Sequence, residues 1–278
     1  MTAGDFDLDG YLARIGWAGP LAPDLATLRR IVAHHTAAIP FEAIEALVGR
    51  TPAVDAAGLQ AKLVGARRGG WCFEQNSLLA LALGALGYQT RPLLARVVFG
   101  LPPGVVLSRT HMALRVELPE GPHLVDAGFG GVTLTGAVAL GSRAAQPTPH
   151  GPFRLVDRPD GLLLQALVGG DWVGLYVVAA DPQLPADIEA ANWLVANRPG
   201  GLFTANLVAS RAPPGRRLSL LNRRLTLRDS DGAETVTLLP GPALGEALRR
   251  AFGLALGEAD LAAIEAALAE PRPGHIPA

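Results

Sequence analysis

The chain has 278 residues, of which 49% are hydrophobic, and its formal net charge at pH 7 is −1. A length of this order favours one globular body with two or three sub-cores. The near-neutral charge gives no electrostatic reason to expect nucleic acid or an anionic membrane as a partner. These numbers argue against a nucleic-acid-binding or membrane-surface protein.

The cysteine count and the N-terminal sequence indicate the compartment. The first 16 residues carry three aspartates and no basic segment ahead of an apolar stretch, so we expect no signal peptide. The apolar run from Ser77 to Gly87 is shorter than the ~20 residues of a membrane span. Cys72 is the single cysteine, which excludes an internal disulfide and a cysteine-based metal cluster. No HxxxH or HExxH pattern is present. We predict a cytoplasmic protein without a metal.

The first ninety residues predict helices. Asp24 and Asp55 are candidate N-caps, and Gly87 follows the last apolar run as a C-terminal stop. The predicted helices cover residues 8–15, 25–39, 56–64 and 72–86.

From Thr90 onward, short segments rich in Val and Leu alternate with Pro and Gly, which predicts strands. Residues 186–200 are ambiguous. Asp231-Gly232 predicts a hairpin turn within the last group of strands. The final stretch returns to helix and ends in a tail that we expect to be frayed. The order predicts an α+β protein, with strands over 91–99, 111–118, 123–129, 153–157, 162–168, 172–178, 202–210 and parts of 217–239, and helices over 242–254 and 260–270.

Cys72 follows the sequence Arg67-Arg68-Gly69-Gly70 and opens a predicted helix. A thiol at a helix N-terminus feels the positive end of the helix dipole, and a nearby arginine adds to that field. Both effects favour the nucleophilic thiolate. Free N–H groups at the helix start are also suited to stabilise an oxyanion. The alternative is a buried, inert cysteine, because free cysteine is among the most buried residue types.

A nucleophilic thiol needs a base, and the base needs an orienting acceptor. His111 begins a predicted strand, and Asp126 lies among apolar residues of the next. The spacing leaves a rival partner: a simple four-residue hairpin at 119–122 places Asp126 opposite Arg115. A less regular connection is needed to bring Asp126 to His111.

The nine residues RGGWCFEQN (68–76) closely resemble the signature of the arylamine N-acetyltransferase family around its acyl-carrying cysteine. Further blocks resemble the family in the family's order, and the chain lacks the long insertion of animal members, which resembles the bacterial type. The blocks are YLARIG (11–16), IPFEAIEALVG (39–49), LLARVV (93–98), RTHMALRV (109–116) and LVDAGFGG (124–131).

The resemblance implies a cysteine-protease-like core in three parts. These are an N-terminal helical bundle (1–88) with the nucleophile, a central β-barrel (89–198) with the histidine and aspartate, and a C-terminal α/β lid (199–278). It implies a ping-pong reaction in which acetyl-CoA acylates Cys72 and an arylamine, hydrazine or arylhydroxylamine then accepts the acetyl group. By position, His111 matches the base and Asp126 the orienting acid. A small-molecule acceptor and a monomer or homodimer are implied as well.

The resemblance also suggests binding residues. The acceptor pocket maps onto Phe41, Val97, Phe129 and Phe203, and Glu42 with Arg68 resembles a structural ion pair. The segment GFGG is in itself a weak candidate for a backbone phosphate nest, but the resemblance assigns CoA contacts to Thr110, Gly128, Phe129, Gly130 and Gly131.

Two other functions use the same residues. One is an amide synthase that closes a macrolactam on the same fold, which needs a wider acceptor pocket. The other is a Cys-His-Asp hydrolase or transglutaminase-like enzyme, whose turnover of an activated ester would not depend on an arylamine.

Overall fold

The computed structural model of the chain describes residues 6–102, 104–179, 181, 183–230, 232–270 and 272–277. Within these residues no helix is long and apolar enough to cross a membrane. The helices are α1 (Leu8–Arg14), α2 (Leu25–Ala38), α3 (Ile44–Leu47), α4 (Ala56–Leu59), the π-helical segment η2 (Gln60–Gly65), α5 (Cys72–Ala85), α6 (Pro185–Asn197), α7 (Leu202–Ala205), α8 (Gly241–Arg250) and α9 (Glu258–Ala269).

The predicted helix caps are confirmed. The Asp24 carboxylate accepts a hydrogen bond from Thr27 N at 2.8 Å at the start of α2, and Asp55 caps α4. Gly87 follows α5 with a φ of 89°, a conformation that glycine adopts without strain. The helix predicted over 56–64 is α4 continued by the wider turn of η2.

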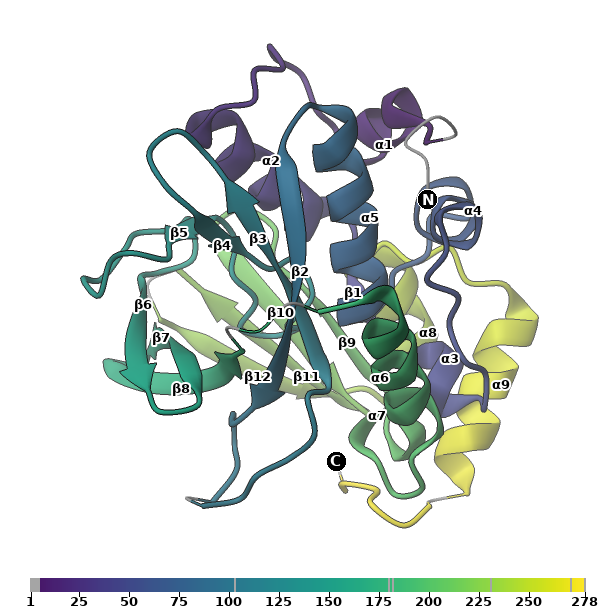
Figure 1. Cartoon of the computed structure of the whole chain (residues 1–278). Helices are drawn as coiled ribbons and strands as arrows, with labels where there is room; N and C mark the ends of the chain where they lie inside the picture. The colour runs from purple at the N-terminus through teal and green to yellow at the C-terminus, as the bar shows by residue number, and fades with distance from the viewer. Residues whose placement is uncertain are drawn as a thin grey trace.

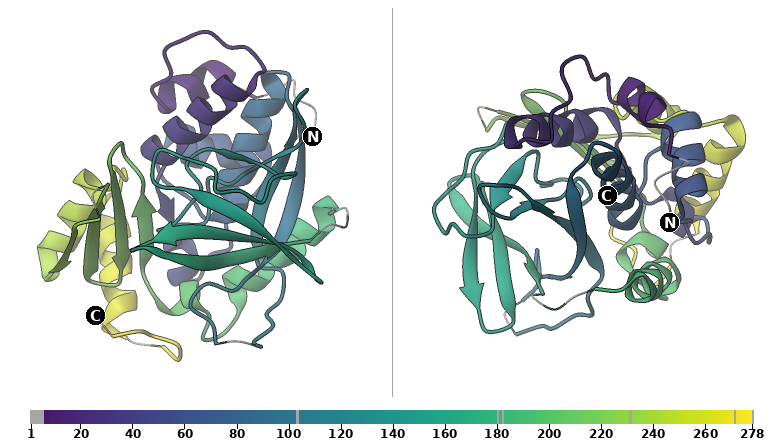
Figure 2. Two further views of the ribbon diagram at one scale, coloured as in Figure 1. Left: turned by 90° about the vertical axis from the view of Figure 1, so that its left-hand side faces the viewer. Right: turned by 45° about the horizontal axis from the view of Figure 1, so that its top comes forward.

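Seven antiparallel strands form one sheet that closes almost completely into the predicted barrel. Figure 2 (right) shows this teal sheet curving round on itself. Gln146 helps to close it: its backbone exchanges two hydrogen bonds with Phe153, and its side chain bonds the backbone of Ala139. In spatial order the strands are β5 (Ala137–Ala139), β4 (His123–Val125), β3 (His111–Glu117), β2 (Gln89–Val97), β8 (Asp171–Val178), β7 (Gly161–Val168) and β6 (Phe153–Arg158).

The two faces of the barrel sheet pack against different groups. Ala95 and Ala113 belong to the apolar cluster inside the barrel, whereas their neighbours Leu94 and Met112 pack against the helices. This alternation follows the two-residue period of a strand. The outer face therefore supports α5, which lies alongside β2 and β3 (Figure 1).

A second, five-stranded sheet carries the C-terminal helices. The short strand β1, from the N-terminal region, pairs with β9. Helices α8 and α9 share an apolar cluster with this sheet and lie on its side away from the barrel (Figure 2, left). The strands in order are β1 (Phe41–Glu42), β9 (Val208–Arg211), β10 (Arg216–Leu221), β11 (Arg224–Asp229) and β12 (Glu234–Leu238).

The predicted strands within 217–239 are therefore confirmed. Strands β11 and β12 form the predicted hairpin, although Asp231 itself lies outside the described residues. The preceding turn uses Asn222 at a φ of 53°, a conformation that asparagine tolerates.

Three local predictions are wrong. The ambiguous residues 186–200 form most of α6, but the strand predicted over 202–210 begins with the helical turn α7, and only its end joins β9. Asn206 explains the turn, because its side chain donates to Leu202 O at 2.9 Å. The strand predicted over 123–129 stops at Val125. The tail is not frayed in its described part: Ile276 N donates to Asn206 and Ile276 O accepts from Asn222.

Candidate active site

The segment ahead of α5 makes a tight approach to its neighbours. A Cβ added at Gly69 would collide with the carbonyl oxygen of Pro40, and one at Gly70 would lie 2.7 Å from a Glu74 carboxylate oxygen. Glu74 in turn accepts a hydrogen bond from Trp71 N at 3.1 Å. The paired glycines are therefore required for packing, and Glu74 caps the helix that begins with the cysteine.

Cys72 is the first residue of α5 and is 5% exposed. Its thiol donates to the carbonyl oxygen of Thr110 at 3.8 Å. Gly128 passes directly over it, because a Cβ at this position would lie 2.5 Å from Cys72 Cα. The structure thus places Thr110 and Gly128, both suggested as CoA contacts, against the cysteine itself.

His111 opens β3 and is held on several sides. Its Nε2 lies 2.8 Å from Asp126 Oδ2, and its ring contacts Phe129 and Tyr176 at centroid distances of 5.2 and 4.6 Å. Burial lowers the pKa of His111, but the charge and hydrogen bond of Asp126, aided by Cys72, outweigh it and raise the pKa to about 10. Because Nε2 is bound to Asp126, Nδ1 is left for the thiol.

Asp126 is completely buried and fully hydrogen-bonded. Its Oδ1 accepts from Asn76 Nδ2 at 2.9 Å and from Gly128 N at 2.8 Å, while Oδ2 faces His111. Burial raises the pKa of Asp126, but the charge of His111 and these hydrogen bonds together hold it below its usual value. The site therefore favours a carboxylate beside an imidazolium.

The register of β3 and β4 explains why Asp126 meets His111. Arg115 pairs with Leu124, so continuing the register places Asp126 opposite Ala113. His111 and Ala113 lie on the same face of β3, two residues apart, which makes His111 the diagonal neighbour of Asp126.

The rival partner is occupied elsewhere. Arg115 donates to Glu117 on its own strand, with 2.6 Å between Nε and Oε1. The connection between β3 and β4 spans 118–122 and is longer than the four-residue hairpin that would have paired Arg115 with Asp126. The interpretation of Asp126 as a partner of Arg115 is therefore wrong.

Two residues of the site were not singled out from the sequence. Asn76 lies four residues after Cys72, on the same face of α5, and that spacing was an available signal. Tyr176 comes to His111 through the pairing of β8 with β2, where it faces Val97. Only the strand register reveals Tyr176.

The loop 128–131 is held in place by hydrogen bonds to Thr133. Phe129 N donates to Thr133 Oγ1 at 3.2 Å, and Arg217 donates to Thr133 O at 3.0 Å. Gly130 has a φ of 92°, and a Cβ on Gly131 would lie 2.6 Å from Ser219 Oγ. With the amides of Gly128 and Phe129 bonded internally, those of Gly130 and Gly131 are the ones this loop can offer to a ligand.

Aromatic side chains form two groups near the triad, one next to Trp71 and one next to His111. Phe203 contacts Phe41 and Trp71 at centroid distances of 5.7 and 5.8 Å. Phe129 contacts Tyr176 at 5.3 Å, on the side of His111. Of the residues suggested for the acceptor pocket, Phe41 and Phe203 thus belong to one aromatic group and Phe129 to another, while Val97 pairs with Tyr176 across the strands.

The predicted ion pair and His35 have structural contacts in this geometry. Glu42 and Arg68 form a buried pair with 2.7 Å between Oε1 and Nη2, as expected. His35 is buried between Tyr11 and Gln75, and burial lowers its pKa to about 4. Among the described residues, no group of three or more His, Cys, Asp or Glu is placed to hold a metal ion.

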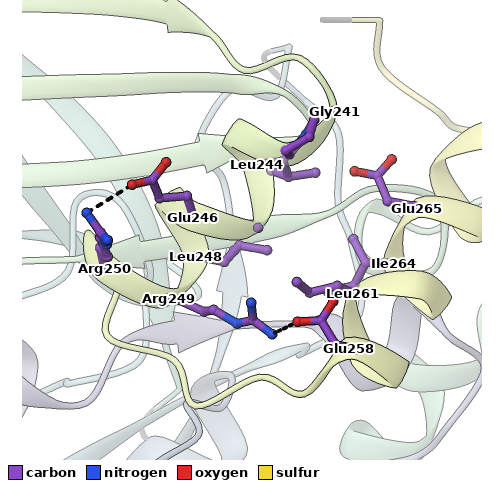
Figure 3. Close-up of a pocket in the computed structure, with 12 residues that line it drawn as sticks. Gly241, Leu244, Glu246, Leu248, Arg249, Arg250, Glu258, Leu261, Ile264 and Glu265 are labelled. Carbon is purple, nitrogen blue, oxygen red and sulfur yellow. Dashed lines mark hydrogen bonds and ion pairs between the residues drawn. The ribbon is translucent and has the colours of Figure 1, made fainter.

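Two cavities in the described part of the chain are lined by none of the three residues Cys72, His111 and Asp126. One of about 650 Å³ separates α8 from α9 and has an apolar floor that includes Leu248, Leu261 and Ile264 (Figure 3). Its rim carries the ion pair between Arg249 and Glu258, drawn as a dashed line (Figure 3). The other, of about 330 Å³, lies beside Arg109 and Asp181.

A buried thiol at a helix start, with an imidazole and a carboxylate at the rim of a barrel, defines a class of cysteine-dependent enzymes. The comparisons with known proteins make this specific. The model of a family described as N-acetyltransferase matches residues 24–261. An arylamine N-acetyltransferase of Mycolicibacterium smegmatis is 38% identical over 95% of this chain and 98% of its own.

Further relatives agree. A Salmonella typhimurium arylamine N-acetyltransferase / N-hydroxyarylamine O-acetyltransferase is 34% identical over 94% of this chain and 95% of its own. The solved structure of Mycobacterium marinum arylamine N-acetyltransferase in complex with CoA superposes with a TM-score of 0.89 at 37% identity, covering 94% of this chain and 98% of that one. The chain belongs to the arylamine N-acetyltransferase family.

Proposed function

We propose that the chain transfers an acetyl group from acetyl-CoA to the nitrogen of arylamines, hydrazines or arylhydroxylamines through an acetyl-Cys72 thioester. The observation that carries the proposal is the 2.8 Å contact between His111 Nε2 and Asp126 Oδ2, which leaves the other ring nitrogen for the cysteine. The CoA named for the M. marinum structure and the arylamines named for the relatives support the substrate classes. The name of the Salmonella typhimurium relative places the acetyl group of an N-hydroxyarylamine product on oxygen.

In the first half-reaction, the Cys72 thiolate attacks the thioester carbonyl of acetyl-CoA. The raised pKa of His111 keeps the ring protonated in the resting site, so it can hand its proton to the departing CoA sulfur. Asp126 holds the ring by its Nε2 hydrogen and stabilises its positive charge. The products are CoA and the acetyl-enzyme.

In the second half-reaction, the amine attacks the acetyl-cysteine carbonyl. His111, now neutral, accepts the proton that the amine nitrogen loses, and Cys72 leaves as a thiolate. CoA must depart before the amine arrives if both use one cleft, which is a ping-pong order. The low exposure of the thiol, 5%, limits access of water and favours transfer over hydrolysis.

We assign the donor to the loop side and the acceptor to the aromatic groups. Gly130 and Gly131 supply backbone amides for CoA, close to Thr110, Gly128 and Phe129. Flat aromatic amines fit against the residues of the proposed acceptor side by ring contacts and apolar burial. These acceptor-facing residues are Phe41, Val97, Phe129 and Phe203.

The cellular compartment and the division of the chain into parts belong to the same proposal. A catalytic thiol must stay reduced, which is met in the cytoplasm. We also propose that the bundle, barrel and lid divide at 1–88, 89–198 and 199–278, so that the site forms where α5 meets the barrel rim.

An activated ester separates transfer from hydrolysis. We expect release of p-nitrophenol from p-nitrophenyl acetate to rise many-fold when an arylamine is added, because the amine discharges the acetyl-enzyme faster than water does. The control is the same assay with Cys72→Ala. Release that is equal with and without the amine would indicate a hydrolase and contradict the proposal.

A further inference from the structure

Asn76 joins the barrel strands β3 and β4 at the point where their backbone pairing stops. Strand β4 ends at Val125, and continuing its register places Ala127 opposite Met112. In place of a direct backbone contact, the Asn76 amide lies between them: Nδ2 donates to Met112 O at 2.7 Å, and Oδ1 accepts from Ala127 N at 3.0 Å. The side chain is completely buried.

The same amide also holds the carboxylate. Asn76 Nδ2 donates to Asp126 Oδ1 at 2.9 Å, on the oxygen that does not face His111. Inserting an amide between two strands separates them by more than a ladder hydrogen bond does. The backbone of Asp126, next in the chain to Ala127, is thereby outside the strand pairing, and its side chain faces the imidazole.

Asn76 belongs to the helix that carries the nucleophile. It follows Cys72 by four residues, so the two side chains lie on one face of α5, about one turn apart. One rigid turn of helix therefore connects the sulfur to the carboxylate, and the imidazole lies between them.

We propose that Asn76 is a positioning residue for the reaction: it sets the distance between the nucleophile helix and Asp126, and so keeps His111 aligned with Cys72. This inference rests on the proposed function of Cys72, His111 and Asp126. It adds a role for Asn76 that a merely packed asparagine would not have, because Nδ2 bonds Asp126 itself. The two ends of the amide also bond the backbone of Met112 and Ala127, the chain neighbours of His111 and Asp126.

The readout is the pH dependence of Cys72 alkylation. Cys72 is the only cysteine, so iodoacetamide labelling followed by intact mass spectrometry measures a single site. In the wild-type protein the protonated His111 ring beside Cys72 promotes alkylation, and we expect the reaction to persist at acid pH. In Asn76→Ser and Asn76→Ala, we expect this low-pH reactivity to fall, because Asp126 and His111 are no longer held in place.

In the same Asn76 variants, the rate of Cys72 acetylation in a single turnover should fall by roughly 10- to 100-fold. Losses of this size are typical when a residue that orients a metal ligand by a hydrogen bond is removed. The matched control is Asn206→Ser. Asn206 is equally buried and bonds Leu202, Gly274, Asn222 and Ile276, none of which belongs to the triad or contacts it in a hydrogen bond. We expect this control to lower the melting temperature while its alkylation profile stays that of the wild type.

Different results would overturn the role of Asn76 and the proposed function of the triad. A folded Asn76→Ser or Asn76→Ala protein with the wild-type profile and acetylation rate would overturn the role of Asn76. Wild-type protein without low-pH alkylation or an acetyl adduct would instead overturn the proposed function. If neither variant folds, hydrogen exchange of the Ala127 amide in the wild type decides: exchange as slow as that of Val125 supports the bridge, and fast exchange rejects it.

Discussion

The buried Glu74 and the partly exposed Lys62 form an ion pair near the nucleophile, with 2.6 Å between Glu74 Oε1 and Lys62 Nζ. The other Glu74 oxygen accepts from Trp71 N, the residue before Cys72, and Glu45 shares the lysine at 2.9 Å. Burial raises the pKa of Glu74 to about 8, although Lys62 acts to lower it. The start of the helix that carries the cysteine is thus stabilised by a carboxyl group whose pKa is about 8.

This pair predicts a pH-dependent stability. The folded-state pKa of Glu74 lies above the value for an exposed glutamate, so its contribution is complete below about pH 4.5 and is lost as the pH rises through about 8. We expect the free energy of unfolding to fall from pH 5 to 8.5, and Glu74→Gln to reduce the slope. His111 contributes in the same sense between about 6.5 and 10 in both proteins.

Urea titrations at pH 5, 6.5 and 8 would measure this slope. Glu45→Gln is the matched control, because Glu45 binds the same lysine but has a side chain that is 21% exposed. Equal slopes for the wild type and Glu74→Gln would show that Glu74 does not titrate in this range.

Asp126→Asn tests the orienting acid. The amide can donate to His111 Nε2 and thereby select the wrong tautomer, which costs ~10⁴ in rate in other triads. We expect a loss of that order in single-turnover acetylation of Cys72. Arg115→Ala should change the rate little, since Arg115 pairs with Glu117. Comparable losses in the two variants would show that Asp126 acts through Arg115.

Gly131→Ala tests how the loop is supported. The added methyl would lie 2.6 Å from Ser219 Oγ, so we expect a lower melting temperature. Ser219→Gly in the same protein removes the clash and should restore it. A KM for acetyl-CoA that stays high in the restored double variant would come from the loss of donor contacts, whereas a normal KM would remove Gly131 from the donor site.

Phe203→Ala separates the two half-reactions. Phe203 contacts Phe41 and Trp71 on the proposed acceptor side. Loss of one aromatic face, about 1.4 kcal/mol, should raise the KM for an arylamine by roughly tenfold. The rate of Cys72 acetylation by acetyl-CoA should stay the same. A slower acetylation with an unchanged amine KM would assign Phe203 to the donor instead.

Local signals in the sequence predicted the elements that short-range chemistry determines. Asp24 and Gly87 mark helix ends by side-chain capping and left-handed backbone, which depend on a few neighbours. The position of Cys72 at a helix start followed from the glycines before it. The family resemblance led to the barrel and to His111 and Asp126 as partners.

Long-range contacts decided the rest. The register that makes His111 a diagonal neighbour of Asp126 depends on the connection at 118–122, which has no periodic signal. It also depends on the Asn76 amide, whose spacing from Cys72 indicates its helix face but not the strand groups that it binds. Helix α7 forms in a strand-like sequence because Asn206 bonds Leu202 O and the C-terminal tail together. Barrel closure rests on Gln146, a single residue in a loop. The division at 1–88, 89–198 and 199–278 stays a prediction.

Intact-protein mass spectrometry after brief exposure to acetyl-CoA tests the central claim most directly. Cys72 is the only cysteine, so one acetyl adduct of 42 Da, as expected for a single acetyl group in place of the thiol hydrogen, should form on it and disappear when an arylamine is added. Cys72→Ala should remain folded and unmodified. An adduct that persists in Cys72→Ala, or transfer to the amine without any acetylated enzyme, would contradict the account.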